Sequence, residues 1–277
     1  MELEDSYVDI VIKAMNGNGL GRRALCKAVS IDSQNLSAFL EGNWEKNIAQ
    51  KICHKLNINY HALDLIAAEE NAWSSIPTTS EINSIATIFE MPGWGQASVN
   101  AYFIEIEPRK YILFDTGTQP SCLVDFLQKH SASLEAIFIT HHHKDHTHGL
   151  DEMTKLISSK KIYSGRSYLS KKTTKITNEK MLIFGSVKVK SYQTPGHTAD
   201  GTSFLVSGLS KPVIVTGDAI FAGSIGGVRS SAYKNALQQI REKILSLPNR
   251  TLILPGHGPI TTVEIEKKRN PFFAICS

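Results

Sequence analysis

The sequence Thr-His-His-His-Lys-Asp-His-Thr-His-Gly, at residues 140–149, decides the fold predicted for most of the chain. It holds five of the protein's ten histidines and follows Ala-Ile-Phe-Ile at 136–139, an apolar run typical of a short buried strand. Alternate residues of an extended segment point the same way, so His141 and His143 can reach one metal ion. Asp145 and His146, on the next turn, can face a second ion. Imidazole and carboxylate ligands suit zinc, iron or manganese.

Three more polar groups follow apolar strands farther along the chain. His197 lies on a Pro-Gly turn, Asp218 follows the run at 213–215, and His257 follows the run at 252–254. Each lies beside a glycine, which lets the backbone approach closely. A histidine-rich loop can be a solvated polar segment, and a lone turn histidine or aspartate can be purely structural. Together, however, five histidines and two aspartates fit two metal ions with three or four protein ligands each.

Length and composition allow one large or two smaller domains. The 277 residues are 42% hydrophobic, which is enough to build a proper core. No apolar run approaches the roughly 18 residues of a membrane span, and the acidic start at residues 1–5 does not resemble a secretory signal. Four scattered cysteines without a Cys-x-x-Cys pair are typical of reduced, structural thiols. We therefore expect a cytoplasmic protein with no membrane partner.

Hydrophobic periodicity divides the chain into two parts. Residues 1–73 form a predicted all-helical domain, with helices at 7–15, 22–29, 33–40, 48–56 and 60–67. A linker rich in Ser, Thr and Pro is predicted at 74–82. From 83 to 277, groups of strands with interspersed helices favour two sheets sandwiched between helices. The predicted fold class is α+β.

The central helices of the first domain, residues 25–42, resemble the Cro/C1-type helix-turn-helix domain, as does the later turn at 56–59. In that family the second helix lies in the major groove, so the resemblance implies that Ser33, Gln34, Asn35 and Ser37 read DNA bases. Residues 1–75, however, hold seven Lys/Arg and ten Asp/Glu, while the remainder carries +7. DNA affinity depends mostly on neutralised phosphates. The acidic balance favours a helical domain kept for homodimerisation or for covering part of the second domain.

The second domain carries Thr-His-x-His-x-Asp-His, Pro-Gly-His, Gly-Asp and Pro-Gly-His, in that order. This order resembles the metallo-β-lactamase superfamily over about residues 83–277. The resemblance implies an αβ/βα sandwich with a binuclear metal site at one edge of its two sheets. It also implies that Asp115, in Asp-Thr-Gly, is the family's buried aspartate that supports the ligands. The ligands that it implies are His141, His143 and His197 for the first metal, Asp145, His146 and His257 for the second, and Asp218 as the bridge.

Within the superfamily, the chain most resembles the hydroxyacylglutathione hydrolases (glyoxalase II). The resemblance rests on residues 194–198, 217–226 and 255–262, and the end at 266–272 is similar to short single-domain members. Two features depart from that family. Gly227 stands where an arginine is expected, with Arg229 two residues on, and the helical C-terminal extension that helps to bind glutathione is absent. Glutathione is therefore left open as part of the substrate.

The predicted reaction is metal-dependent hydrolysis of a thioester or ester. Two divalent ions, zinc first and iron or manganese as alternatives, would lower the pKa of a bridging water from about 16 to about 7. The resulting hydroxide would attack the carbonyl, with Asp145 and Asp218 as the catalytic metal-holding carboxylates. A thiolate leaving group needs little protonation, because thiols have a pKa near about 8.5. An anionic substrate would suit the positive domain, with Arg166 and Lys175 as predicted anchors.

Other functions use the same residues. A lactonase or β-lactamase-like hydrolase would differ only in its pocket. A persulfide dioxygenase of this superfamily would hold a single iron with His141, His197 and Asp218. A different class altogether is a DNA-binding regulator whose metal domain senses a ligand or redox state.

Overall fold

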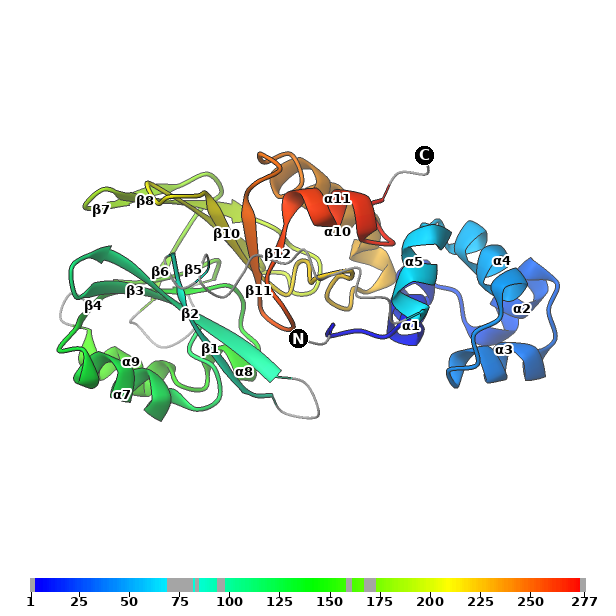
Figure 1. Ribbon diagram of the computed structural model, residues 1–277, viewed down its shortest axis with the longest axis horizontal. Coiled ribbons are helices and arrows are strands. Elements are labelled where there is room, and N and C mark those ends of the chain that lie inside the picture. The colour runs from blue at the N-terminus through cyan, green and yellow to red at the C-terminus, as the bar shows by residue number, and fades with distance from the viewer. Residues whose placement is uncertain are drawn as a thin grey trace.

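The computed structural model describes residues 3–68, 82, 85–93, 98–157, 161–166 and 173–274. Within these residues, two six-stranded sheets face each other and helices cover their outer sides (Figure 1). Five helices precede the sheets in the sequence and lie at one end of the molecule (Figure 1). The predicted αβ/βα sandwich with a preceding helical region is confirmed. Residues 74–81 of the predicted linker lie outside the described residues.

Four of the five N-terminal helices begin at a side chain that caps their free N–H groups, and the second begins at Gly21 without one. Ser6 and Asp9 form a capping box at the start of the first helix, and Asp32 and Asn59 cap the third and fifth. The second, third and fifth helices have the predicted bounds, whereas the first ends two residues later and the fourth begins two residues earlier than predicted. The helices are α1 (Tyr7–Gly17), α2 (Arg22–Val29), α3 (Ser33–Leu40), α4 (Lys46–Leu56) and α5 (Tyr60–Ala67).

The first sheet has the order β1-β2-β3-β4-β5-β6. Its first three strands are antiparallel, and β3 to β6 are parallel. The strands are β1 (Thr87–Pro92), β2 (Ser98–Glu107), β3 (Lys110–Phe114), β4 (Ser133–Ile139), β5 (Ile162–Ser164) and β6 (Thr173–Lys175).

The second sheet has the order β12-β11-β10-β9-β8-β7. Its pairs are antiparallel except for β10 with β11. The strands are β7 (Met181–Phe184), β8 (Val187–Gln193), β9 (Thr202–Ser207), β10 (Val213–Gly217), β11 (Leu252–Pro255) and β12 (Thr261–Thr262).

The main core lies between the two sheets. The rings of Phe138 on β4 and Phe204 on β9 lie 5.1 Å apart, and Phe114 packs against both. Apolar residues on the other face of the first sheet pack under α7 (Pro120–Lys129) and α9 (Leu150–Leu156). On the outer side of the second sheet, Ile214 and Ile253 pack with α10 (Ser230–Lys243) and α11 (Val263–Arg269). Burial on both faces explains why the inner strands are almost wholly apolar.

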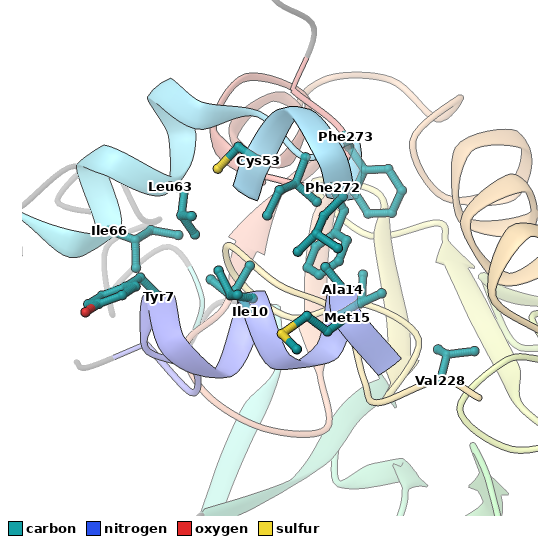
Figure 2. Packing of buried hydrophobic residues seen from close by; sticks show 14 of the residues in the cluster. Tyr7, Ile10, Ala14, Met15, Cys53, Leu63, Ile66, Val228, Phe272 and Phe273 are labelled. Atoms are coloured by element: carbon teal, nitrogen blue, oxygen red, sulfur yellow. The ribbon is translucent and has the colours of Figure 1, made fainter. Parts of the chain in front are cut away.

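The core of the helical part continues into the second sheet's outer layer. Buried residues of α1 belong to one cluster with Val228, Phe272 and Phe273 (Figure 2). Gly17 lies directly on the ring of Tyr233 in α10, where a Cβ would be 2.4 Å from a ring carbon. The main-chain N–H of Asn59 also donates to the carbonyl of Pro271, at 2.7 Å. The five helices are therefore packed onto the sandwich.

The Lys/Thr-rich stretch after residues 161–163 has the composition of a loop, and a loop is what its sequence predicts. In the structure, residues 173–175 of this stretch form β6 at the edge of the first sheet. An edge strand is held by main-chain hydrogen bonds to its neighbour, which need no apolar side chains. Residues 167–172 of this stretch lie outside the described residues. Within the part of the chain that the structure describes, no helix is long and apolar enough to cross a membrane.

Candidate metal centre

The predicted ligands meet where strands of both sheets end. His141 and His143 follow β4, and the one-turn helix α8 (Lys144–Thr147) carries the next two ligands. His197 lies on the turn after β8, Asp218 follows β10, and His257 follows β11. Loop residues at the ends of a rigid sheet are well placed for binding and catalysis.

The first group contains His141, His143, His197 and Asp218, whose ligand atoms all lie within 4.8 Å of one another. Nδ1 of His143 is 3.1 Å from Nε2 of His141 and 3.0 Å from Nε2 of His197. The Oδ2 atom of Asp218 lies 3.3 Å from Nε2 of His197. Three imidazoles and one carboxylate around a common point form a suitable ligand set for one divalent transition metal.

The second group contains Asp145, His146 and His257. Nε2 of His257 lies 3.5 Å from Oδ2 of Asp145, and Nε2 of His146 lies 3.9 Å from the same oxygen. Asp218 faces this group as well: its Oδ1 is 3.3 Å from His146 and its Oδ2 is 3.5 Å from His257. Asp218 thus borders both groups.

Two buried atoms support the binding of a cation here. Nε2 of His146 and Oδ1 of Asp218 have no hydrogen-bond partner within the described residues, although both are buried. Buried polar atoms are normally paired, so these two orphaned lone pairs fit a cation between them. Glycines leave the space that the ligands need. A Cβ on Gly256 would lie 2.3 Å from Oδ1 of Asp218, and one on Gly226 would lie 2.1 Å from the carbonyl oxygen of Asp218. The residues present fit two divalent ions.

The protonation states of His141 and His143, in the first group, suit metal binding. Burial lowers the pKa of His141 well below its usual value and also lowers that of His143, which keeps both rings neutral. Neutral imidazole is the form that binds a metal. Burial alone would raise the pKa of Asp218, but the facing ring of His146 outweighs it and holds that pKa well below its usual value. Burial would lower the pKa of His146, but Asp218 and Asp115 raise it well above its usual value. Asp218 is therefore ionised, which is the form of a carboxylate that binds a metal.

Three of the candidate ligand rings are each held by a hydrogen bond from Nδ1, while their Nε2 atoms face the metal groups. Asp115 accepts from Nδ1 of His146 at 2.8 Å, and it also accepts the N–H of Thr140 at 2.8 Å and its hydroxyl at 2.7 Å. Nδ1 of His197 donates to the carbonyl of Gly227 at 2.9 Å, and Nδ1 of His257 donates to that of Ser98. These contacts direct each Nε2 toward the metal groups, which is the usual role of such supporting partners.

A cavity of about 500 Å³ opens beside His143 and His197. Its walls are the turn at 195–199 and the first turn of α10, with Arg229 and Asn235. The predicted anchors Arg166 and Lys175 are exposed, and neither lines this cavity. Sequence reasoning noted Arg229 only as a departure from the family pattern. It missed His142, which lines the same cavity and whose Nδ1 lies 2.7 Å from the buried Asp200. No local pattern indicates this pair, because its residues are 58 positions apart.

The predicted base readers lie on α3, away from the sandwich (Figure 1). Ser33, Gln34 and Asn35 are exposed and Ser37 is half-buried. The side chain of Asn35 donates to the Asp32 carboxylate at 2.7 Å, so it is engaged in capping the helix. DNA binding by these residues stays a prediction.

Comparison with known proteins agrees with this geometry. Residues 94–175 match the family model of the metallo-beta-lactamase superfamily. "Probable metallo-hydrolase YqgX" of Bacillus subtilis is 30% identical over 200 residues, which cover 64% of this chain and 93% of that protein. This chain belongs to the metallo-β-lactamase superfamily.

Two other proteins are similar over different shares of their own length. "Probable hydroxyacylglutathione hydrolase glo2" of Schizosaccharomyces pombe is 27% identical over 167 residues, 59% of this chain and 65% of that protein. The crystal structure of BLEG-1, a B3 metallo-β-lactamase, superposes with a TM-score of 0.56 at 28% identity and covers 68% of this chain and 100% of its own. In the present chain, the two His/Asp groups are consistent with a binuclear metal site.

Proposed function

We propose that this protein is a binuclear metallohydrolase that cleaves a thioester or ester. The observation that carries the proposal is the position of Asp218, whose carboxylate lies 3.3 Å from His197 of the first His/Asp group and 3.3 Å from His146 of the second. A carboxylate shared in this way supports two cations a short distance apart. We propose zinc as the metal, with iron or manganese as alternatives, because imidazole and carboxylate suit all three.

Two bound cations would activate a water molecule and polarise a substrate carbonyl at neutral pH. The chain's own residues prepare that site. Asp115, Gly227 and Ser98 hold three ligand rings in one orientation. Asp145 and Asp218 supply two negative charges that offset the charge of the cations. The cavity beside His143 gives the substrate access to the same point.

The cavity also supports the substrate class. No Asp or Glu is among the described residues that line it, and the Nδ1 atom of the wall residue His142 is already paired with Asp200, so its walls offer no carboxylic acid to protonate a leaving group. A thiolate leaves without such help, because its pKa is about 8.5. Arg229 contributes a positive charge at the cavity, which favours an anionic substrate. We therefore propose an anionic thioester, and a hydroxyacylglutathione is the first to test, given the similarity to glo2.

The test is metal content and turnover of S-D-lactoylglutathione on one purified sample. About two metals per chain with rapid cleavage would support the proposal. His143→Ala should lose both metal and activity, while His54→Ala, an exposed histidine of α4, should keep both. Full activity of His143→Ala would contradict the assignment of the site.

The same sample separates the alternatives. Two metals without thioester cleavage would direct the search to lactones and to β-lactams, which the likeness to BLEG-1 makes reasonable substrates. A single iron with oxygen consumption on a persulfide would support a dioxygenase, and the second His/Asp group would then have no ion to hold.

A further inference from the structure

The segment before α1 and α1 itself lie against both loops that support the metal ligands. One is the loop at 219–229, between Asp218 and α10, whose Gly227 carbonyl holds the ring of His197. The other is the turn at 256–258, which carries His257. Figure 1 shows α1 on the far side of the sandwich from α7 and α9.

Lys13 of α1 makes the central contact. Its Nζ pairs with the buried carboxylate of Asp5 and donates to the carbonyl of Ile225 at 2.9 Å. The same ammonium lies 5.0 Å from the centre of the Phe221 ring, within the range of a cation–π interaction. Only 19% of the Lys13 side chain is exposed. With three partners, the side chain is fixed in one position between α1 and the loop.

Phe221 and Ile225, the two loop residues that contact Lys13, each lie next to a candidate ligand or its support. The Phe221 ring packs edge-on against the ring of His257, with centres 5.6 Å apart. Ile225 lies two residues before Gly227, which accepts from His197. The loop between them is stiff, because Phe221 and Ser224 exchange two main-chain hydrogen bonds of 3.0 and 3.2 Å. A shift at Lys13 would therefore move the supports of ligands in both metal groups.

The residues before α1 also contact the loop at 219–229 and the turn at 256–258. A Cβ on Gly258 would lie 3.1 Å from the Cβ of Glu4, so the chain at Glu4 runs directly over the turn that follows His257. Leu3 packs against Ala222 and Ile265. These contacts hold the N-terminal segment beside the loop that Lys13 binds.

We propose that Lys13 is a positioning residue of the metal centre, through which the N-terminal helical part holds the His197 and His257 rings in place. The helical part is then a component of the hydrolase site rather than an appended module. This inference rests on the proposed binuclear centre but not on the identity of its substrate.

The experiment is Co²⁺ titration of metal-free full-length protein, followed by visible absorption and competition with a chelator. Lys13→Met removes the charge and keeps the length of the side chain, and it should weaken Co²⁺ binding about tenfold and alter the absorption spectrum. Lys13→Arg, which keeps the charge, should recover most of the affinity. Lys27→Met, an exposed lysine of α2, is the matched control and should bind like the wild type.

Lys13→Met also leaves Asp5 buried without its partner, so the double variant Asp5→Asn/Lys13→Met is measured beside it. Phe221→Leu tests the same path from the loop, and its effect should not add to that of Lys13→Met. Wild-type Co²⁺ affinity and spectrum in either folded Lys13→Met variant would overturn this proposal alone. A wild-type protein that binds no Co²⁺ would overturn the binuclear centre as well.

Discussion

Nδ1 of His146 lies 2.8 Å from a carboxylate oxygen of Asp115, so the end of β3 orients a ligand carried by α8. The same carboxylate accepts the N–H and the hydroxyl of Thr140, directly before His141. Asp115 thus links the end of β4, at Thr140, to α8, and the first candidate ligands lie on these two segments. Its backbone has a φ of +55°, an unfavourable conformation that these contacts stabilise.

Asp115→Ala should weaken metal binding by about 10- to 100-fold, because His146 loses the partner that fixes its ring. Competition with a chelator measures the affinity. Asp125→Ala, an exposed aspartate on α7, is the control and should leave the affinity unchanged. Equal affinities of the two variants would show that His146 needs no such support.

Gly256→Ala should lower the metal content, because the new methyl group would lie 2.3 Å from Oδ1 of Asp218 and 2.6 Å from Cε1 of His146. Both atoms belong to ligands held on several sides, so neither can move away cheaply. Gly21→Ala, before α2, is the matched control, since no atom lies within 4 Å of its added Cβ. Elemental analysis of both purified variants checks the prediction, which a fully metallated Gly256→Ala protein would contradict.

Glu266 should make the metal-free protein less stable as the pH rises from about 4.5 to about 7. Burial raises the pKa of its carboxyl to about 7 from an ordinary 4.5, although Thr261, Asn270 and the N–H of Gly223 donate to it. The folded state then binds more protons than the unfolded state in this window. The stabilisation is complete below the unfolded pKa and lost as the pH passes the folded one, a change of about 3 kcal/mol.

Glu266→Gln removes the titration and should flatten the pH dependence of the free energy of unfolding over that window. Urea unfolding at several pH values measures it. Glu264→Gln, an exposed neighbour on α11 paired with Lys268, should keep the wild-type slope. An unchanged slope in Glu266→Gln would mean that the carboxyl is ionised throughout.

DNA binding should be absent or unselective in a gel shift against genomic fragments at low salt. The Asp32 carboxylate caps the N-terminus of α3, where a helix would otherwise offer its N–H groups to a phosphate. A selective shift that Gln34→Ala removes would contradict this expectation and support the regulator. Homodimerisation through the helical part also stays a prediction, which sedimentation of the full chain would test.

Local sequence was informative where the chemistry is local. The spacing within 141–146 and the glycines beside His197, Asp218 and His257 pointed to metal ligands, and apolar runs predicted the inner strands. Helical periodicity predicted the bounds of α2, α3 and α5, whereas α1 ends two residues later and α4 begins two residues earlier than predicted. β6 was missed, because it is only three residues long and is defined by its main-chain pairing with β5.

The sequence by itself determined the types of ligand, their order along the chain and the two-sheet fold, because short-range spacing and hydrophobic period encode these. Only the tertiary structure decided that Asp218 borders both His/Asp groups, that Asp115 holds His146, and that Lys13 reaches the loop beside them. Such contacts join residues up to 212 positions apart, and they arise when separate layers pack on a shared core. No local pattern records which polar side chains then meet.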